Sequence, residues 1–157
     1  MNMVHLPARL AVFMMANLML CESEEHTDGR LDPTCSEIHN GTNEGTIQNP
    51  MYPDNDHGSK FCNYQITVPS NNQVALSFPE LESQQRYMGL VVFDGPDCMS
   101  RWIGYLNYPN NKPFISSGNS ITAVLTVPLK FEVWRFKGNY ATVLPDNICR
   151  NFSDSCK

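Results

Sequence analysis

The densest group of side chains that could support chemistry is the sequence DNDH at residues 54–57. A carboxylate and an imidazole this close in sequence can bind a metal ion or orient a general base. Asp and Asn also favour turns, because their side chains hydrogen-bond to nearby backbone groups. The segment lies between two short apolar stretches, so we interpret it as a solvated turn and not as a metal or catalytic site.

No other part of the chain has the residue pattern of an active site. No serine or cysteine lies in a nucleophile motif, and no glycine-rich loop that could hold a phosphate group is present. Beyond residue 23 the histidines are His26, His39 and His57, and His26 lies in a polar segment. The sequence therefore predicts a protein with no catalytic residue, no metal site and no cofactor.

The first 23 residues have the three parts of a secretory signal peptide. Arg9 supplies a positive charge, residues 10–21 form an uncharged and mostly apolar run of 12 residues, and the small Ser23 follows. That run is shorter than the roughly 20 residues of a membrane-spanning helix. We therefore predict a signal peptide at 1–23, a polar lead-in at 24–34 and a secreted, extracellular protein.

Length and charge narrow the class of protein further. The residues beyond the predicted signal peptide suit one domain, and none of their segments is apolar for long enough to span a membrane. The formal net charge is -5. Phosphate binding relies on clustered Lys and Arg, so this charge argues against nucleic acid as a partner.

The cysteines beyond the predicted signal peptide are expected to form disulfides. No two of them have the close spacing of a structural zinc pair, and an oxidising exterior favours pairing. Because their number is odd, one thiol must stay free, pair with another chain or carry a cap. They are Cys35, Cys62, Cys98, Cys149 and Cys156.

Short runs of alternating apolar and polar residues begin at Cys62, and turn-forming sequences separate them. A period of two is typical of strands, and no window after the leader has apolar residues at helical spacing. The runs are CNYQITV at 62–68, VALSF at 74–78, SITAVLTV at 120–127 and KFEVWRF at 130–136. For the last run the buried side is not evident. We predict an all-β fold, an antiparallel β-sandwich that is jelly-roll-like.

Several motifs, in this order and at these spacings, resemble the CUB domain, an extracellular β-sandwich module. GTIQNPMYP at 45–53 is similar to the family pattern GxIxSPxYP, with Asn49 in place of the serine. The other similar motifs are CNYQI at 62–66, VALSF at 74–78, VVFDG at 91–95 and ISSGNSITAVLT at 115–126. The resemblance implies a CUB-type domain at 35–143, followed by a cysteine-containing tail at 144–157.

The resemblance also implies a disulfide between Cys35 and Cys62. Closing that loop of about 26 residues should stabilise the fold by about 3 to 4 kcal/mol in the chain-entropy model. Pro50 and Pro53 lack N–H donors and fix φ, so they lead the chain over one end of the sandwich without offering a free edge. On this interpretation the segment is scaffold.

Many CUB domains bind calcium through three acidic positions, and this sequence departs from that pattern. The resemblance puts Met88 at one aspartate position and Val127 or Pro128 at another. Glu82 could be the remaining ligand only if two residues are missing between it and Gln85. Calcium takes oxygen ligands, and a thioether is a poor substitute. We therefore expect no calcium site of the family type.

The family's second disulfide is also missing, because Gln85 and about Asn107 stand where its cysteines would be. Two arrangements of the remaining cysteines compete. Cys98 joins Cys149 or Cys156 and clamps the tail onto the sandwich, or Cys149 and Cys156 close a small loop and leave Cys98 free. We slightly prefer the clamp, and both stay open because sequence does not fix connectivity.

Two sequence motifs could accept N-linked glycans in a secreted protein. They are NGT at Asn40 and NFS at Asn151, and each fits a loop or tail where a glycan is tolerated. We expect glycosylation at both, with an unused motif as the alternative at each.

Aromatic and arginine residues in predicted loops are the candidates for a binding surface, because these types dominate interface hot spots. Packing in the core or cover of a sheet edge is the alternative role for each. The candidates are Arg86, Arg101, Trp102, Tyr105 and Tyr108.

The resemblance implies a non-enzymatic module that mediates extracellular protein–protein interaction through loops at one end, without the family's calcium site. A second hypothesis is a carbohydrate-binding protein with a single CUB domain, which sugar-competable retention on a glycan support would indicate. A third is a non-catalytic fragment of a larger secreted protease, which a longer transcript with a catalytic domain would indicate.

Overall fold

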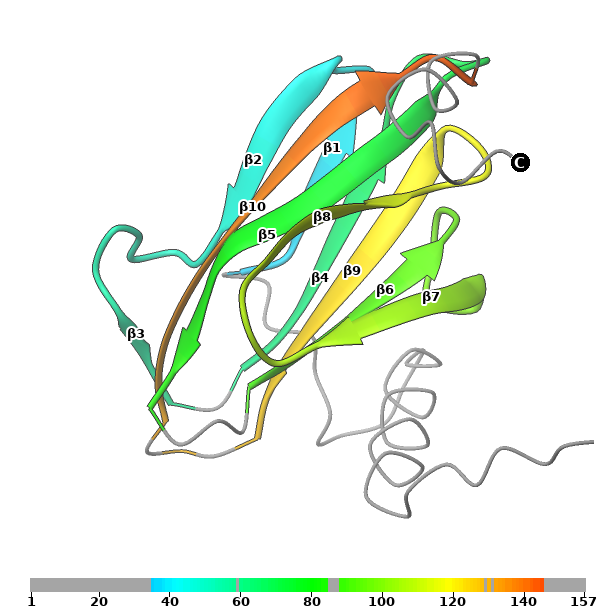
Figure 1. Cartoon of the computed structure of the whole chain (residues 1–157). Coiled ribbons are helices and arrows are strands. Elements are labelled where there is room, and N and C mark those ends of the chain that lie inside the picture. Colours follow the sequence, from blue (N-terminus) through cyan, green and yellow to red (C-terminus); the bar gives the residue numbers. More distant parts are fainter. Residues whose placement is uncertain (1–34, 59, 85–87, 129, 131, 146–157) are drawn as a thin grey trace, which may run out of the picture.

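The computed structural model describes residues 35–58, 60–84, 88–128, 130 and 132–145. These residues form ten strands, and none of them belongs to an α-helix (Figure 1). The strands are β1 (Glu37–Asn40), β2 (Glu44–Gln48), β3 (Asp56–His57), β4 (Lys60–Thr67), β5 (Gln73–Ser83), β6 (Gly89–Asp94), β7 (Arg101–Leu106), β8 (Asn110–Ile115), β9 (Ser120–Val127) and β10 (Val133–Val143). The all-β prediction is confirmed.

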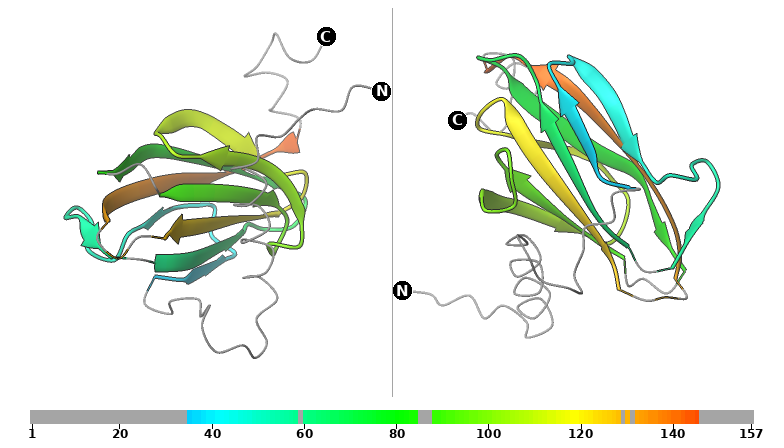
Figure 2. Two further views of the ribbon diagram at one scale, coloured as in Figure 1. Left: turned by 90° about the horizontal axis from the view of Figure 1, so that it is seen from below. Right: turned by 180° about the vertical axis from the view of Figure 1, so that it is seen from behind.

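The strands form two sheets that pack face to face (Figures 1 and 2). The first sheet has the order β1-β4-β9-β6-β7. The second sheet has the order β2-β10-β5-β8, and β3 pairs with β10. All paired strands run antiparallel except β1, which runs parallel to β4. The predicted antiparallel β-sandwich is thus confirmed.

Alternate side chains of the strands fill the space between the two sheets, because successive residues of a strand point to opposite faces. The predicted alternation is confirmed by the buried residues Cys62, Tyr64 and Ile66 of β4, Val74, Leu76 and Phe78 of β5, and Ile121, Ala123, Leu125 and Val127 of β9. The buried side of β10 is that of Trp134 and Phe136, whose rings stack with centroids 6.3 Å apart.

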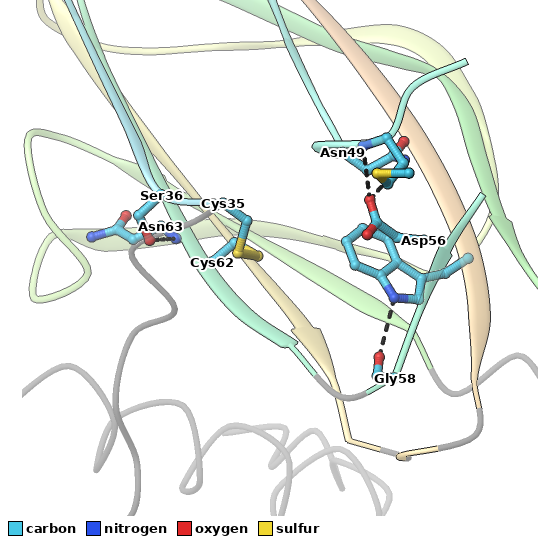
Figure 3. Close-up of a disulfide and its surroundings, with 9 residues drawn as sticks. Cys35, Ser36, Asn49, Asp56, Gly58, Cys62 and Asn63 are labelled. Atoms are coloured by element: carbon cyan, nitrogen blue, oxygen red, sulfur yellow. Dashed lines mark hydrogen bonds between the residues drawn. A yellow bond between two sulfur atoms is a disulfide. The ribbon is translucent and has the colours of Figure 1, made fainter. Parts of the chain in front are cut away.

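The loop between β2 and β3 is pinned by a buried amide and carboxylate (Figure 3). Asn49 Nδ2 donates to Asp56 Oδ2 at 3.0 Å, and Asn49 Oδ1 accepts from the N–H of Phe136 at 3.1 Å. The same Asp56 oxygen accepts from the N–H of Met51 at 3.1 Å. The interpretation of DNDH as a solvated turn is therefore wrong for Asp56, although Asp54 is exposed as expected.

Packing explains the glycine that opens the first CUB-like motif. A Cβ at Gly45 would collide with the ring and hydroxyl of Tyr140. The Tyr140 hydroxyl lies 2.7 Å from Thr42 Oγ1 and 3.1 Å from His39 Nδ1. It therefore links β1 of the first sheet to β10 of the second.

The implied disulfide between Cys35 and Cys62 is confirmed (Figure 3). The two Cα atoms are 5.4 Å apart and the residues are 27 positions apart in the sequence. Beside it, Ser36 Oγ accepts a hydrogen bond from the N–H of Asn63 at 3.1 Å. The bridge and this bond fasten the residues before β1 to the start of β4.

The predicted signal peptide, the lead-in and residues 146–157 lie outside the described residues. Within the part of the chain that is described, no helix has the length and apolar character needed to cross a membrane.

The loops gather at two ends of the sandwich, as the register shows. Thr67 pairs with Ser120, Phe93 with Thr122 and Gln73 with Val143, so the strand ends near these residues lie together. We call this the hairpin end, and its loops are 41–43, 68–72, 95–100 and 116–119. The opposite end holds the loops 49–55 and 107–109 and the β5–β6 and β9–β10 connections.

Candidate interaction surface

The β6–β7 hairpin, at the right of Figure 1, carries two of the predicted binding residues at the hairpin end. Its turn has a defined conformation: Asp97 Oδ1 accepts from the N–H of Met99 at 3.0 Å and from Ser100 Oγ at 2.9 Å. Gly95 has a φ of 153°, and a Cβ there would collide with the Ser100 side chain. The β6–β7 connection therefore contains an Asx turn at Asp97, and the backbone before it adopts a conformation at Gly95 that favours glycine.

A buried carboxylate braces the base of the hairpin. The Asp94 side chain is 2% exposed, and it accepts hydrogen bonds from the N–H of Ser117 at 2.6 Å and from Arg101 Nη2 at 2.7 Å. Burial by itself raises the pKa of Asp94, but the hydrogen bonds from Ser117 and Arg101 outweigh burial, and the net pKa is lowered. Asp94 is therefore held ionised, between the hairpin and the β8–β9 turn.

Three residues that are close in sequence on the hairpin have exposed side chains, and we call them the hairpin patch: Met99, Arg101 and Trp102. Met99 is 61% exposed and Trp102 is 40% exposed, while the Arg101 side chain is 73% exposed. Trp and Arg are the residue types most enriched at interface hot spots, and Met adapts to irregular partner surfaces. The patch has the composition of a protein-binding site.

The structure separates the other predicted binding residues from this patch. Tyr105 is half-buried and packs against Val91 and Phe93 on the outer face of the first sheet. Tyr108 is exposed in the β7–β8 loop at the opposite end. Arg86 lies outside the described residues. Of the five candidates, Arg101 and Trp102 are the two that are exposed on the β6–β7 hairpin, and they belong to β7 and not to a loop as predicted.

Met99 is a member of the patch that sequence reasoning missed. The hydrogen bonds of Asp97 to the Met99 N–H and to Ser100 fix the turn in which Met99 is exposed. A methionine in a sequence does not by itself indicate whether its side chain is buried or exposed. Its position two residues after the turn-forming sequence DGPD at 94–97 was the available signal.

The resemblance places Met88, and Val127 or Pro128, at two of the family's acidic calcium positions. Met88 and Val127 are buried among apolar side chains. Glu82 pairs instead with Arg135, whose Nη2 lies 3.0 Å from Glu82 Oε1. In the described ranges, no group of three or more His, Cys, Asp or Glu side chains could hold a metal ion.

A second surface feature is a shallow hollow of about 560 Å³ on the outer face of the second sheet. Its lining residues are mostly small or polar, and several can donate or accept hydrogen bonds, although most of the surface that they expose there is apolar. The lining includes Glu44, Thr46, Ala75, Ser77, Asn111, Pro113, Asn139 and Ala141.

Two of the predicted modification sites can be placed. Asn40 is exposed and directly precedes Gly41, whose φ of 73° starts the β1–β2 turn. Cys98 is buried in the β6–β7 turn and is disulfide-bonded. Asn151, Cys149 and Cys156 lie outside the described residues.

The structure is that of a disulfide-bonded β-sandwich domain, with two sheets packed face to face and a disulfide beside the first strand. The CUB domain family model matches residues 35–140, and the chain belongs to the CUB domain family. The resemblance noted from the motifs is thus confirmed.

Two curated relatives illustrate how the domain is used in larger chains. Human CUB and zona pellucida-like domain-containing protein 1 is 29% identical over 111 residues, which are 68% of this chain and 18% of that protein. A bone morphogenetic protein 1 homolog of Strongylocentrotus purpuratus is 39% identical over 82 residues, which are 49% of this chain and 13% of that protein. The chain therefore spans 18% or less of the length of these relatives.

Solved structures agree on the fold. The CUB1-EGF-CUB2 domains of rat MASP-1 match with a TM-score of 0.57 at 21% identity, over 76% of this chain and 46% of that one. The MASP-1 CUB2 domain bound to Ca²⁺ matches with a TM-score of 0.55 at 22% identity, over 68% of this chain and 99% of that one. At this identity the likeness shows the fold alone.

Proposed function

We propose that the chain is a secreted, non-enzymatic module that binds another extracellular protein through the hairpin patch. CUB domains typically mediate protein–protein interaction and are in general not catalytic. The observation that carries the proposal is that Arg101 and Trp102, successive residues of β7, are both exposed on a hairpin whose base Asp94 braces. A partner that covers them would desolvate the two residue types that contribute most to interfaces.

The brace favours binding because it orders the patch in advance. Fixing a flexible side chain at an interface costs about 0.5–1.5 kcal/mol, and Arg101 is already held by its bond to Asp94. Its side chain remains exposed, so other guanidinium N–H groups can meet a partner's carboxylate or carbonyl. Less entropy is therefore lost when a partner docks.

We further propose that this binding needs no calcium. The buried Met88 and Val127 supply no oxygen ligand, and Glu82 is engaged by Arg135. These positions also lie at the opposite end of the sandwich from the hairpin patch. Removing calcium should leave the patch unaltered.

Secretion and glycosylation are part of the same proposal. The leader at 1–23 has the parts of a signal peptide, and the Cys35–Cys62 disulfide suits an oxidising exterior. Asn40 is exposed at a turn, where a glycan can be attached without disturbing the sheets.

Photo-crosslinking at matched positions tests the proposal. Met99 and Met51 have similar exposure, 61% and 57%, but Met99 belongs to the hairpin patch and Met51 to the opposite end. Each is replaced in turn by a photoreactive amino acid, and the secreted protein is irradiated in extracellular fluid. We expect a discrete protein adduct from position 99 and none from position 51. Equal labelling at both positions, or adducts at 51 alone, would refute the location of the site.

Carbohydrate binding is the second candidate function, and the hollow on the second sheet favours it. Its carboxylate, amide and hydroxyl groups, from residues such as Glu44, Asn139 and Ser77, could hydrogen-bond to sugar hydroxyls. Retention on a glycan column that free sugar competes away and Asn139→Ala weakens would support this function. Retention that free sugar does not affect would exclude it. That the chain is part of a larger secreted protease stays a prediction.

A further inference from the structure

The outer face of the first sheet carries a second apolar cluster, separate from the core between the sheets. We call it the outer-face cluster: Val91, Phe93, Cys98 and Val124, with Phe61 and Tyr105 packed beside them. Their register shows on which face they lie. Val91 pairs with Val124, whereas their neighbours Leu90, Val92, Ala123 and Leu125 point into the core between the sheets. Because successive side chains alternate, the cluster must face outward.

An outward face of a sandwich is normally polar and wet, yet this one is not. Val91, Phe93 and Val124 are only 3–8% exposed. The β6–β7 turn folds over part of the face, since Thr122 Oγ1 donates to the carbonyl oxygen of Gly95 at 2.9 Å and Cys98 packs in the cluster. The cluster is therefore a covered apolar surface, and apolar surface is stabilising only while it stays covered.

A covalent bond ties another part of the chain to this face. Cys98 is disulfide-bonded. Cys35 and Cys62 are bonded to each other, so neither is its partner. The remaining cysteines of the chain are Cys21, Cys149 and Cys156, and all three lie outside the described residues. Cys21 belongs to the predicted signal peptide, which leaves the two tail cysteines in the secreted protein.

The tail starts at the correct end of the sandwich to reach Cys98. Val143, the last residue of β10, pairs with Gln73 at the hairpin end. From there the N–H of Val74 donates to Ser116 Oγ at 2.7 Å, and the N–H of Ser117 donates to Asp94 at 2.6 Å, at the base of the turn that carries Cys98. Cys149 is the sixth residue after Val143, and six extended residues reach about 20 Å.

We infer that the C-terminal tail is bonded through Cys149 or Cys156 to Cys98 and lies on the outer-face cluster. The tail supplies suitable apolar groups, because Ile148 and Phe152 stand on either side of Cys149 in the sequence. The bond holds them against Phe93 and Val91 at high effective concentration. The same bond anchors the turn next to the hairpin patch, so the tail also helps to present that patch.

Disulfide mapping of the secreted full-length protein tests the covalent part. Free thiols are first blocked by alkylation, and the protein is then digested without reduction. We expect a peptide that links Cys98 to Cys149 or to Cys156. An alkylated Cys98, a bond from Cys98 to Cys21 or to a second chain, or a Cys149–Cys156 peptide would overturn the inference. Partner binding is not involved in this readout, so its outcome is independent of the proposed function.

Hydroxyl-radical footprinting tests whether the tail covers the cluster. The double variant Ile148→Ser/Phe152→Ser keeps every cysteine and should raise oxidation of Phe93 and Tyr105 several-fold. The polar tail substitution Asp154→Asn serves as the matched control and should leave that oxidation at the level of the unaltered protein. Unchanged oxidation of Phe93 and Tyr105 in the double variant would overturn the inference that the tail lies on this face.

Discussion

The two ends of the sandwich use buried carboxylates in opposite ways. At the opposite end, Asp56 binds Asn49 and the backbone of the β2–β3 loop, and it holds that loop inward. At the hairpin end, the Asp94 side chain is also shielded from solvent, but it binds the Arg101 side chain, which is itself exposed. One carboxylate closes its end of the fold, and the other orders a group that can meet a partner.

The difference bears on the proposal that the hairpin patch binds its partner without calcium. Glu82, Met88 and Val127, which the resemblance relates to the family's calcium positions, lie at the opposite end. There Met88 and Val127 pack among apolar side chains, and Glu82 pairs with Arg135. The exposed arginine and tryptophan lie at the hairpin end. The proposed binding surface therefore lies at the other end of the sandwich from these positions.

The chain's two tryptophans provide the largest expected contrast between the ends. Trp134 is buried at the opposite end, stacks on Phe136 and donates from Nε1 to the carbonyl oxygen of Gly58 at 3.1 Å. Trp134→Ala should lower the free energy of unfolding by about 3–5 kcal/mol, because it leaves a cavity and removes a hydrogen bond. Trp102→Ala should lower it by at most about 1 kcal/mol. Urea unfolding followed by circular dichroism measures both, and similar losses would contradict the contrast.

Asp94 should make the hairpin end sensitive to acid. Its pKa is lowered in the folded protein, so it adds stability above its unfolded pKa of about 3.9 and loses that stability as pH falls through the lower folded value. Asp94→Asn should lower the free energy of unfolding at neutral pH by about 1–3 kcal/mol and flatten its dependence on pH below about 4. Urea unfolding across pH 2–7 is the measurement. The exposed Asp54 at the other end supplies the control Asp54→Asn, and an equal effect there would refute the role of Asp94.

Tyr64 and Tyr140 are both buried, but the Tyr140 hydroxyl has two hydrogen-bond partners and the Tyr64 hydroxyl has none among the described residues. Within the described residues the Tyr64 hydroxyl has no hydrogen-bond partner, and burial raises its pKa above the usual range. Tyr64→Phe should leave the free energy of unfolding unchanged or raise it by about 1 kcal/mol. Tyr140→Phe should lower it by about 1 kcal/mol, because the bonds to Thr42 and His39 are lost. Thermal unfolding of the two variants measures both changes. A Tyr64→Phe variant less stable than the unaltered protein would show that the Tyr64 hydroxyl does form a hydrogen bond.

The smallest effect is expected at the exposed ion pair of Glu82 with Arg135. Glu82→Gln should lower the free energy of unfolding by about 0.2–1 kcal/mol at low salt and by less at high salt, because surface pairs are screened. Unfolding at two ionic strengths checks this. A larger loss of unfolding free energy that high salt does not reduce would contradict the assignment of this pair as a weak surface interaction.

The fold could be predicted from the sequence because its signals are local. A period of two identifies the runs that contain Tyr64, Leu76 and Leu125 as strands, and the CUB-like motifs identify the sandwich and the Cys35–Cys62 bridge. These features depend on neighbouring residues or on ordered motifs, and the structure agrees with them.

The candidate site was only partly predictable because it depends on how distant segments meet. Arg101 and Tyr108 are close in sequence, but an extended strand advances about 3.3 Å per residue and carries them to opposite ends. Likewise, Asp56 is buried because Asn49 also binds Phe136 in a strand far along the chain. Contacts between residues far apart in the sequence cannot be predicted from its composition or its hydrophobic periodicity.

The central claim is that the hairpin patch binds an extracellular protein without calcium, and affinity capture tests it most directly. Unaltered protein and Trp102→Ala are each immobilised and exposed to extracellular fluid, with and without a chelator, and Tyr108→Ala at the opposite end is the matched control. We predict a partner that unaltered protein and Tyr108→Ala retain under both conditions and that Trp102→Ala does not retain. Retention by Trp102→Ala equal to that of the unaltered protein, or loss of the partner from the unaltered protein on chelation, would contradict the account.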